Sequence, residues 1–153
     1  MAETAPGAQS GDKQFAIQKL YIKDVSFESP NTPKVFTEEW KPEVEFNLNS
    51  KTNKAADDLF EVSLTVTVTV KNNEVTAYLA EATQVGIFGA KGFEKPELGQ
   101  LLGSFCPNIL FPYIREVISD MVIKGGFPPM LLAPVNFDAL YAQQQRDPNA
   151  KAN

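Results

Sequence analysis

The clearest pattern along the chain is a strict alternation of apolar and polar side chains over residues 60–70. Six apolar side chains occupy the even positions, and glutamate, serine and threonine occupy the odd ones. Successive side chains of a β-strand point to opposite faces, so this pattern predicts a strand with one buried face. Residues that favour strands resume over 75–88. Asn72 and Asn73 suit a two-residue turn with positive φ, so the two segments together predict an antiparallel hairpin.

Two further alternations lie upstream of this hairpin. Residues 43–48 place apolar side chains on one face and glutamate or asparagine on the other, which predicts a third strand. Residues 15–28 predict a fourth strand, although their apolar side chains fall in both phases. Phe15, Ile17, Tyr21, Val25 and Phe27 share one phase, and Leu20 and Ile22 have the other. We therefore expect this strand to lie at an edge or to be partly covered on both faces.

Beyond residue 88 the apolar residues follow the spacing of helices. Pro96 suits a first helical turn, and we expect Pro107 to break or kink the helix that begins there. The apolar face of this first helix consists of Leu98, Leu101, Leu102 and Phe105. A second helix is predicted from residue 108 to a stop at Gly125 and Gly126. Its apolar stripe consists of Leu110, Ile114, Val117, Ile118 and Met121.

A proline-rich apolar connector follows the second helix. Asn136 is then a candidate N-cap for a short helix that carries Phe137, Leu140 and Tyr141. Strands followed by helices predict an α+β domain, with a four-stranded antiparallel sheet and helices packed on one face. We expect one domain over residues 15–146, between disordered tails at 1–14 and 147–153. The helices carry more apolar surface than one small sheet can cover, which favours an oligomer with a further binding surface.

Charge and composition narrow the classes of function. The 153 residues include 19 acidic and 14 basic side chains, for a net charge of -5 and no basic run. This argues against nucleic-acid binding and makes a cationic partner easier to attract. A signal peptide is not apparent, and no apolar run approaches the roughly 18 residues of a membrane span, so we expect a soluble intracellular protein without membrane insertion.

The chain offers little for catalysis. It has no histidine, which removes the commonest general base and metal ligand. The single Cys106 lies in the apolar stretch "GSFCPNILF" and is interpreted as a buried structural residue. Asp57 and Asp58 are adjacent, so in a strand they would point to opposite faces, and a turn or strand start suits them better than acid–base chemistry. We expect neither an enzyme nor a cofactor.

The stretch "SPNTPKVFTEEWKP", residues 29–42, combines three prolines with large apolar side chains. It follows neither the helical nor the strand period, so it should be a loop. Val35, Phe36 and Trp40 in such a segment either fold back onto a core or await a partner.

Four motifs at consistent spacing resemble the family of the bacterial export chaperone SecB. They are "YIKDVSFESPNTPKVFTEEWKPEV", "LAEATQVGIF", "GSFCPNILFPYIREVISDMV" and "LAPVNFDALY", in order from about Phe15 to Tyr141. The resemblance implies an ATP-independent cytosolic homotetramer, a dimer of dimers. Such a protein holds unfolded secretory precursors in a translocation-competent state and delivers them to the SecA motor of the Sec pathway.

The resemblance also implies three sets of functional residues. A crossover loop and the C-terminal helix would wall a client groove lined by Phe27, Phe36, Trp40, Phe137 and Leu140. The outer face of the sheet would bind SecA through Asp24, Glu28, Leu79 and Glu81. The residues Ala80, Ala82 and Gln84 match positions that affect the tetramer interface, with an alanine at 80 where relatives can carry cysteine.

Other interpretations remain open from the sequence. Trp40 could fill the core beneath its loop, and the carboxylates could be ordinary solvated groups. A small-ligand-binding protein or enzyme could use the aromatic loop as its pocket, although convergent catalytic side chains are lacking. An adaptor for one folded partner is a third possibility.

Overall fold

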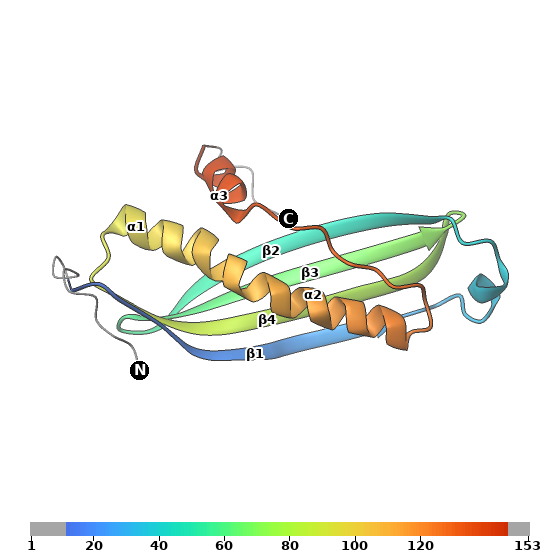
Figure 1. The fold of residues 1–153 in the computed structure, drawn as a ribbon, viewed down its shortest axis with the longest axis horizontal. Coiled ribbons are helices and arrows are strands. Elements are labelled where there is room, and N and C mark those ends of the chain that lie inside the picture. The colour runs from blue at the N-terminus through green and yellow to red at the C-terminus, as the bar shows by residue number, and fades with distance from the viewer. Residues whose placement is uncertain (1–11, 147–153) are drawn as a thin grey trace.

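A computed structural model of the chain describes residues 12–146 (Figure 1). Its centre is a four-stranded antiparallel sheet in the order β1-β4-β3-β2. The strands are β1 (Gln14–Glu28), β2 (Pro42–Ala56), β3 (Leu59–Asn72) and β4 (Val75–Lys91). Helices lie on one face of this sheet, so the expected α+β architecture is confirmed. Most of the expected tails lies outside the described residues, and β1 begins at Gln14, one residue before the expected start of the domain.

Two β-bulges explain the mixed phases of β1. The pairing with β4 skips Gln18, between Ile17 and Lys19, and skips Lys23, between Ile22 and Asp24. Each extra residue reverses the alternation of side chains without changing the pairing of the strand. All the large apolar side chains except that of Tyr21 therefore lie on the helix-covered face: Phe15, Ile17, Leu20, Ile22, Val25 and Phe27. As expected, β1 is an edge strand.

The hairpin between β3 and β4 is confirmed, but its expected turn is wrong by one residue. Asn73 and Glu74 form the turn with φ of 53° and 65°, and Asn72 pairs with Val75 as the last residue of the ladder. The side chain of Asn72 is fully buried and binds the backbone of the loop before β2. This use of its amide explains why Asn72 belongs to the strand and not to the turn.

Of the break or kink expected at Pro107, the break is absent: the helix continues through the proline, with a π-helical turn just before it. Helix α1 (Lys95–Gln100) passes through a π-helical turn (Leu101–Phe105) into α2 (Cys106–Lys124), as one coil across the sheet (Figure 1). Proline lacks the N–H for an α-helical bond and crowds the preceding turn, and the wider π turn accommodates it. The added residue also shifts the helical phase, so Phe105 is 50% exposed although the spacing had placed it on the buried face.

The core forms between α2 and the central strands. Every even residue from Val62 to Val70 is at most 1% exposed, which confirms the alternation of β3. Opposite them, Leu110, Ile114 and Ile118 of α2 are fully buried, while Val117 and Met121 pack at the margin. Helix α2 ends at Lys124, and Gly126 follows with φ of 87°, which confirms the glycine stop.

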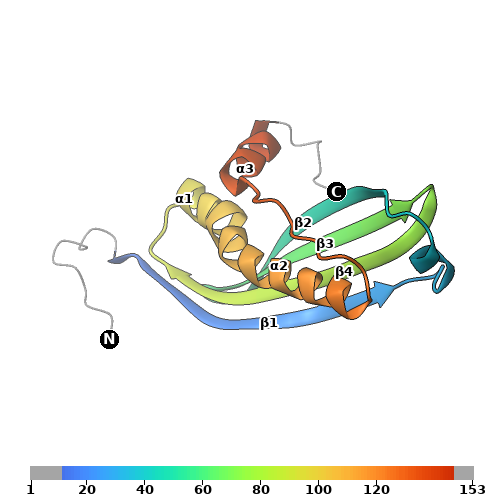
Figure 2. The ribbon, with the colours of Figure 1, turned by 45° about the vertical axis from the view of Figure 1, so that its right-hand side comes forward.

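Two irregular segments complete the helix-covered side. A crossover segment, residues 29–41, joins β1 to β2 at one end and contains a 3₁₀ turn at Lys34–Thr37. A connector, residues 127–136, returns along the sheet from the end of α2 to α3 (Phe137–Arg146) (Figures 1 and 2). Asn136 Oδ1 accepts a hydrogen bond from the Ala139 N–H at 3.0 Å, which confirms the expected N-cap. Within residues 12–146, none of the helices has the length and apolarity to cross a membrane.

Candidate functional site

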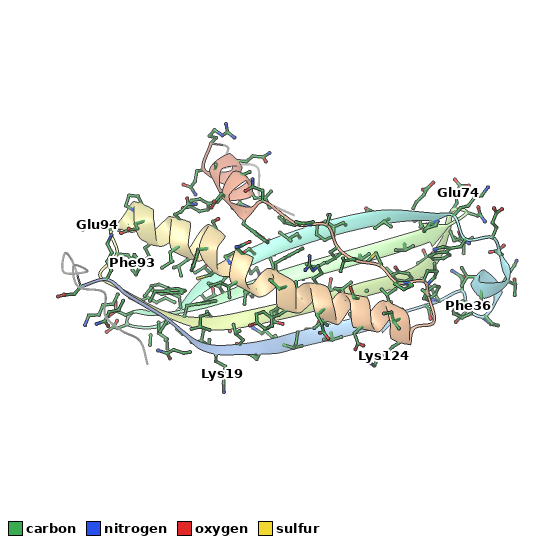
Figure 3. All side chains as sticks on the ribbon, viewed as in Figure 1. Lys19, Phe36, Glu74, Phe93, Glu94 and Lys124 are labelled. Atoms are coloured by element: carbon green, nitrogen blue, oxygen red, sulfur yellow. The ribbon has the colours of Figure 1, made fainter. Side chains whose placement is uncertain are left out.

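Five rings gather where the crossover segment meets the end of α2. The buried Phe127 is central: its ring centroid lies 4.7 Å from that of Tyr78, 5.0 Å from Phe36, 5.8 Å from Trp40 and 6.4 Å from Phe27. We call these five residues the aromatic cluster. Phe36 is half exposed, and Figure 3 shows it at the crossover end of the molecule, far from Phe93 and Glu94. The cluster therefore offers rings to solvent on a buried aromatic base.

The crossover segment is held so that its rings keep their positions. Val35 is only 2% exposed and anchors the 3₁₀ turn in the core. The amide of Asn72 accepts from the Lys41 N–H at 2.6 Å and donates to the Glu39 carbonyl at 3.0 Å. Asn72 thus fixes the backbone on both sides of Trp40. Trp40 is partly buried, so it packs on the core and still belongs to the surface of the loop.

A second hollow lies between α3 and the inner face of β2. This α3 pocket has a volume of about 930 Å³. Its apolar lining includes Phe46 and Leu48 of β2, Leu102 of the π turn, and Leu140 and Tyr141 of α3. Its polar lining residues include Ser50, Thr52, Asn136, Gln143 and Gln144, and none of its lining side chains within residues 12–146 is charged. The pocket could therefore hold several apolar, uncharged side chains of a bound polypeptide.

Helix α3 is attached to the π turn by its first turn. The carboxylate of Asp138 accepts from Gln100 Nε2 at 2.9 Å and from the hydroxyl of Ser104. Phe137 is 5% exposed and packs edge-on against Phe111, with ring centroids 5.8 Å apart. These contacts place Leu140, one turn later, on the wall of the pocket.

The five residues expected in one client groove fall into two groups. Phe27, Phe36 and Trp40 belong to the aromatic cluster, and Phe137 and Leu140 belong to the α3 pocket. The connector links the two groups, because it begins with Phe127 and its last residues, Pro134 to Asn136, line the pocket. Several residues of these two sites were not predicted from the sequence: Tyr78, Phe127, Phe46 and Leu48. The sequence did contain signals for some of them. Phe127 is the aromatic residue of the apolar "GGFPP" stretch, and Phe46 and Leu48 lie on the apolar face of the alternation in β2.

The four residues expected to bind SecA do lie together, on the opposite face of the sheet. Glu28 pairs with Leu79, Ser26 with Glu81, and Asp24 with Thr83, so these side chains share the face that α2 does not cover. We call Asp24, Glu28, Leu79 and Glu81 the acidic patch. Glu81 is oriented by Thr67, whose hydroxyl donates to it at 2.7 Å. Asp24 and Glu28 are exposed.

Another part of this outer face is covered by Tyr21. Its hydroxyl donates to Glu61 of β3 at 2.8 Å, so the side chain reaches from β1 across β4, where its strand partner Val85 is 0% exposed. This hydrogen bond raises the pKa of Tyr21 and lowers that of the Glu61 carboxyl. The outer face is therefore polar and ordered by cross-strand bonds.

The residues expected to affect the tetramer interface are already covered within one chain. Ala80, Ala82 and Gln84 point toward α2 and are 0%, 0% and 4% exposed. Any effect of these positions on assembly would therefore act through the placement of α2. Ala82 is fully buried in the core, so a larger side chain there would have to displace its neighbours.

The titratable groups considered from the sequence have structural surroundings. Cys106 is fully buried under the sheet, and burial raises the pKa of its thiol to about 12, which supports a structural role. Asp57 and Asp58 form the turn between β2 and β3, as expected, with Asp58 at φ of 57°. Burial also raises the pKa of Tyr78 to about 12, and its hydroxyl lies 3.6 Å from Met130 Sδ.

Comparison with known proteins identifies the family to which this chain belongs. The chain matches the family model of SecB, described as preprotein translocase subunit SecB, over residues 8–148. It is 67% identical over 136 residues to the protein-export protein SecB of Methylococcus capsulatus, an alignment that covers 89% of this chain and 88% of that protein. It is 55% identical over 152 residues to the corresponding protein of Nitrosococcus oceani, covering 95% and 93% of the two chains.

A solved structure shares the fold. A SecB-like chaperone of Mycobacterium tuberculosis, in complex with a peptide from an antitoxin, matches with a TM-score of 0.65 at 15% identity. The match covers 79% of this chain and 90% of that one. The resemblance found in the four sequence motifs is thus confirmed along nearly the whole chain. The chain belongs to the SecB family of protein-export chaperones.

Proposed function

We propose that this protein is an ATP-independent holdase of the cytoplasm that assembles as a homotetramer, a dimer of dimers. It binds unfolded secretory precursors, keeps them translocation-competent and delivers them to SecA. Membership of the SecB family over residues 8–148 is the observation that carries this proposal. The peptide bound to the SecB-like chaperone of M. tuberculosis supports polypeptide as the type of ligand.

The client surface consists of the aromatic cluster, the connector and the α3 pocket. An unfolded chain presents apolar side chains at irregular spacing, so a receptor for many clients needs several adaptable apolar sites. The half-exposed Phe36 and the partly buried Trp40 and Phe27 supply rings. The α3 pocket supplies an uncharged hollow lined by Phe137 and Leu140. One extended client can contact both sites along the connector.

Each of these contacts is weak, and affinity comes from their number. When one site has bound, the next contact along the same client is intramolecular, and avidity can exceed single-site affinity by roughly 10²- to 10⁴-fold. Four copies of the surface extend this gain over a long precursor. Tight holding therefore needs no nucleotide or other cofactor.

Delivery uses the acidic patch on the other face of the sheet. Asp24, Glu28 and Glu81 would attract a basic segment of SecA, and Leu79 would add an apolar contact. The neighbouring residues Phe27 and Glu28 support this division of labour, because their pairing with Ala80 and Leu79 directs them to opposite faces. Client holding and motor docking are then separate functions of one sheet.

Assembly would cover apolar surface that the single chain exposes. Ile17, Ile22 and Val25 of β1 are 40–47% exposed on the helix-covered side, and Phe105 and Tyr113 are 48–50% exposed on the π turn and α2. A pair of protomers can bury these residues against each other. Ala80, Ala82 and Gln84 would influence this contact by supporting α2 from below.

Binding of denatured and folded precursors tests the proposal. The purified protein should form complexes with several denatured secretory precursors, without ATP, and should ignore their folded forms. Light scattering should give close to four times the 16.9 kDa of one chain. Selective binding of one folded partner, or of a small molecule with no affinity for unfolded chains, would contradict the holdase and favour the adaptor or the ligand carrier.

A further inference from the structure

We propose that Tyr141 is a positioning residue that sets the width of the α3 pocket, because its ring rests on two glycines of the helix opposite. The inference rests on the proposed role of this pocket in client binding. Tyr141 would act by holding α3 as a wall at a fixed distance from β2. Client affinity would then depend on Gly99 and Gly103, which bear no side chain of their own.

The contact between Tyr141 and the two glycines is close. Gly99 and Gly103 lie one turn apart, at the end of α1 and in the π turn, and we call them the glycine seat. A Cβ added at Gly103 would overlap Cδ1 and Cε1 of the Tyr141 ring. A Cβ added at Gly99 would lie 2.5 Å from Tyr141 Oη but 3.7 Å from Cζ. The ring therefore meets Gly103 with its carbon edge and Gly99 with its hydroxyl alone.

Within residues 12–146, two places on α3 attach it to the continuous helix formed by α1, the π turn and α2, and the contact with the glycine seat is one of them. The first is the turn at Phe137 and Asp138, which binds Phe111, Gln100 and Ser104. Tyr141 follows Phe137 by four residues and so projects from the same side of the helix one turn later. One attachment leaves a helix free to pivot, whereas two fix its direction. Loss of the second attachment would allow the later part of α3 to swing away from β2.

Such a swing would change the pocket more than the fold. Leu140, Tyr141, Gln143 and Gln144 all line the pocket from α3, and Phe46 and Leu48 face them from β2. None of these four α3 side chains is buried in the core beneath α2, and only that of Leu140 packs against its margin. A displaced α3 would thus leave the sheet and α2 intact while separating the two walls that close on a client.

Atom-specific substitutions test the proposal. Gly103→Ala should speed amide hydrogen exchange in α3 and weaken binding of an unfolded precursor by about three- to tenfold, the size of losing one well-packed apolar contact. Gly99→Ala should do the same in the presence of Tyr141. In the Tyr141→Phe background, adding Gly99→Ala should change α3 exchange and client affinity little, because the hydroxyl that would clash with the new Cβ is absent. Gly103→Ala should still weaken client binding in the Tyr141→Phe background, because the ring carbons that it would overlap are still present. In the Tyr141→Ala background, adding Gly103→Ala should cause no further loss.

Matched measurements keep the alternatives apart. Gly89→Ala serves as the control, since the nearest atom to a Cβ there is Nε2 at the flexible end of Gln18, at 3.3 Å, which needs to move by only a few tenths of an ångström. If Gly99→Ala weakens clients equally with tyrosine and phenylalanine, Tyr141 is not the positioning residue and the proposal is wrong. Unchanged exchange in α3 of Gly103→Ala would likewise overturn it. If exchange rises while client affinity stays constant, and Leu140→Ser also binds clients normally, the pocket is not a client site and the proposed function fails there.

Discussion

Two buried side chains, those of Asn72 and Cys106, fix elements that form the proposed client surface. Asn72 has no exposed surface, yet its two hydrogen bonds reach the backbone on either side of Trp40. Cys106, also fully buried, lies where α2 begins on the sheet. Neither residue would contact a client. Each one fixes the placement of an element that belongs to the proposed client surface.

Replacing Asn72 should disturb the loop more than the hairpin turn beside it. Asn72→Ala leaves the Lys41 N–H and the Glu39 carbonyl without their partner, which costs about 1–3 kcal/mol for each group that stays buried. We expect a lower free energy of unfolding in denaturant titrations and a red-shifted Trp40 emission. Asn73→Gly is the matched control, since Asn73 has φ of 53° and glycine accepts this conformation. Equal stability of the Asn72 and Asn73 variants would contradict this account.

The thiol of Cys106 should be protected in the folded protein. Its pKa is about 12, against an ordinary value of 9.0, so at pH 8 the thiolate fraction falls from roughly one in ten to roughly one in ten thousand. Alkylation should therefore be slow until denaturant is added. The unfolded thiol loses its proton first, so this group lowers stability as pH rises from about 9 to about 12. Rapid labelling of the native protein would show that α2 separates from the sheet.

Whole elements show which features a sequence pattern can predict. The alternation in β3 and the helical spacing in α2 follow directly from one buried face each, and both were predicted correctly. The two bulges of β1 and the π turn before Pro107 were not, because an added residue reverses or shifts the phase without leaving a local signature. The residues of the candidate site could likewise be predicted only where a local pattern marked them. Phe36 and Trp40 were apparent as rings in a loop, whereas their shared neighbour Phe127 lies more than 80 residues away in the chain.

The crossover segment should contribute to client binding through its rings. Phe36→Ala with Trp40→Ala removes two members of the aromatic cluster, and we expect binding of a denatured precursor to weaken by about 1–4 kcal/mol. The core should persist, because Val35 still anchors the loop. Affinity is measured by competition with a labelled precursor after the tetramer mass has been checked. Val75→Ala, a truncation of another exposed apolar residue, is the control. Equal affinity in both variants would exclude the rings from the client surface.

The molecule as a whole separates its two proposed activities by the thickness of a sheet. The aromatic cluster and the α3 pocket lie on the helix-covered side, and the acidic patch lies on the other. Strand β1 contributes to both surfaces, because its consecutive residues Phe27 and Glu28 point to opposite faces. This arrangement allows a client to remain bound while a second protein docks behind it.

Charge reversal should therefore remove one activity and keep the other. Asp24→Lys with Glu81→Lys should abolish SecA binding, while tetramer mass and client affinity stay near those of the parent. Added salt should weaken the parent complex with SecA, because exposed charges are screened. Asp57→Lys with Glu94→Lys changes the net charge equally, at exposed positions outside the patch. If this control also fails to bind SecA, the net charge determines binding and the acidic patch does not. If the Asp24→Lys, Glu81→Lys variant loses both client and SecA binding, the two faces are not separable.

The two bulges of β1 also give this strand a tolerance to changes of length. Gln18 and Lys23 are surplus to the pairing with β4, so a chain that lacks either one can close a regular ladder with every other side chain on its present face. A one-residue deletion at Thr83 of β4 has no such remedy, because β4 pairs on both sides there. Insertions and deletions during evolution should accordingly accumulate near residues 18 and 23 of the edge strand. The central strands, by contrast, should keep a constant length, since a lost residue would reverse the two faces of the strand on one side of the deletion and so turn buried core side chains toward water.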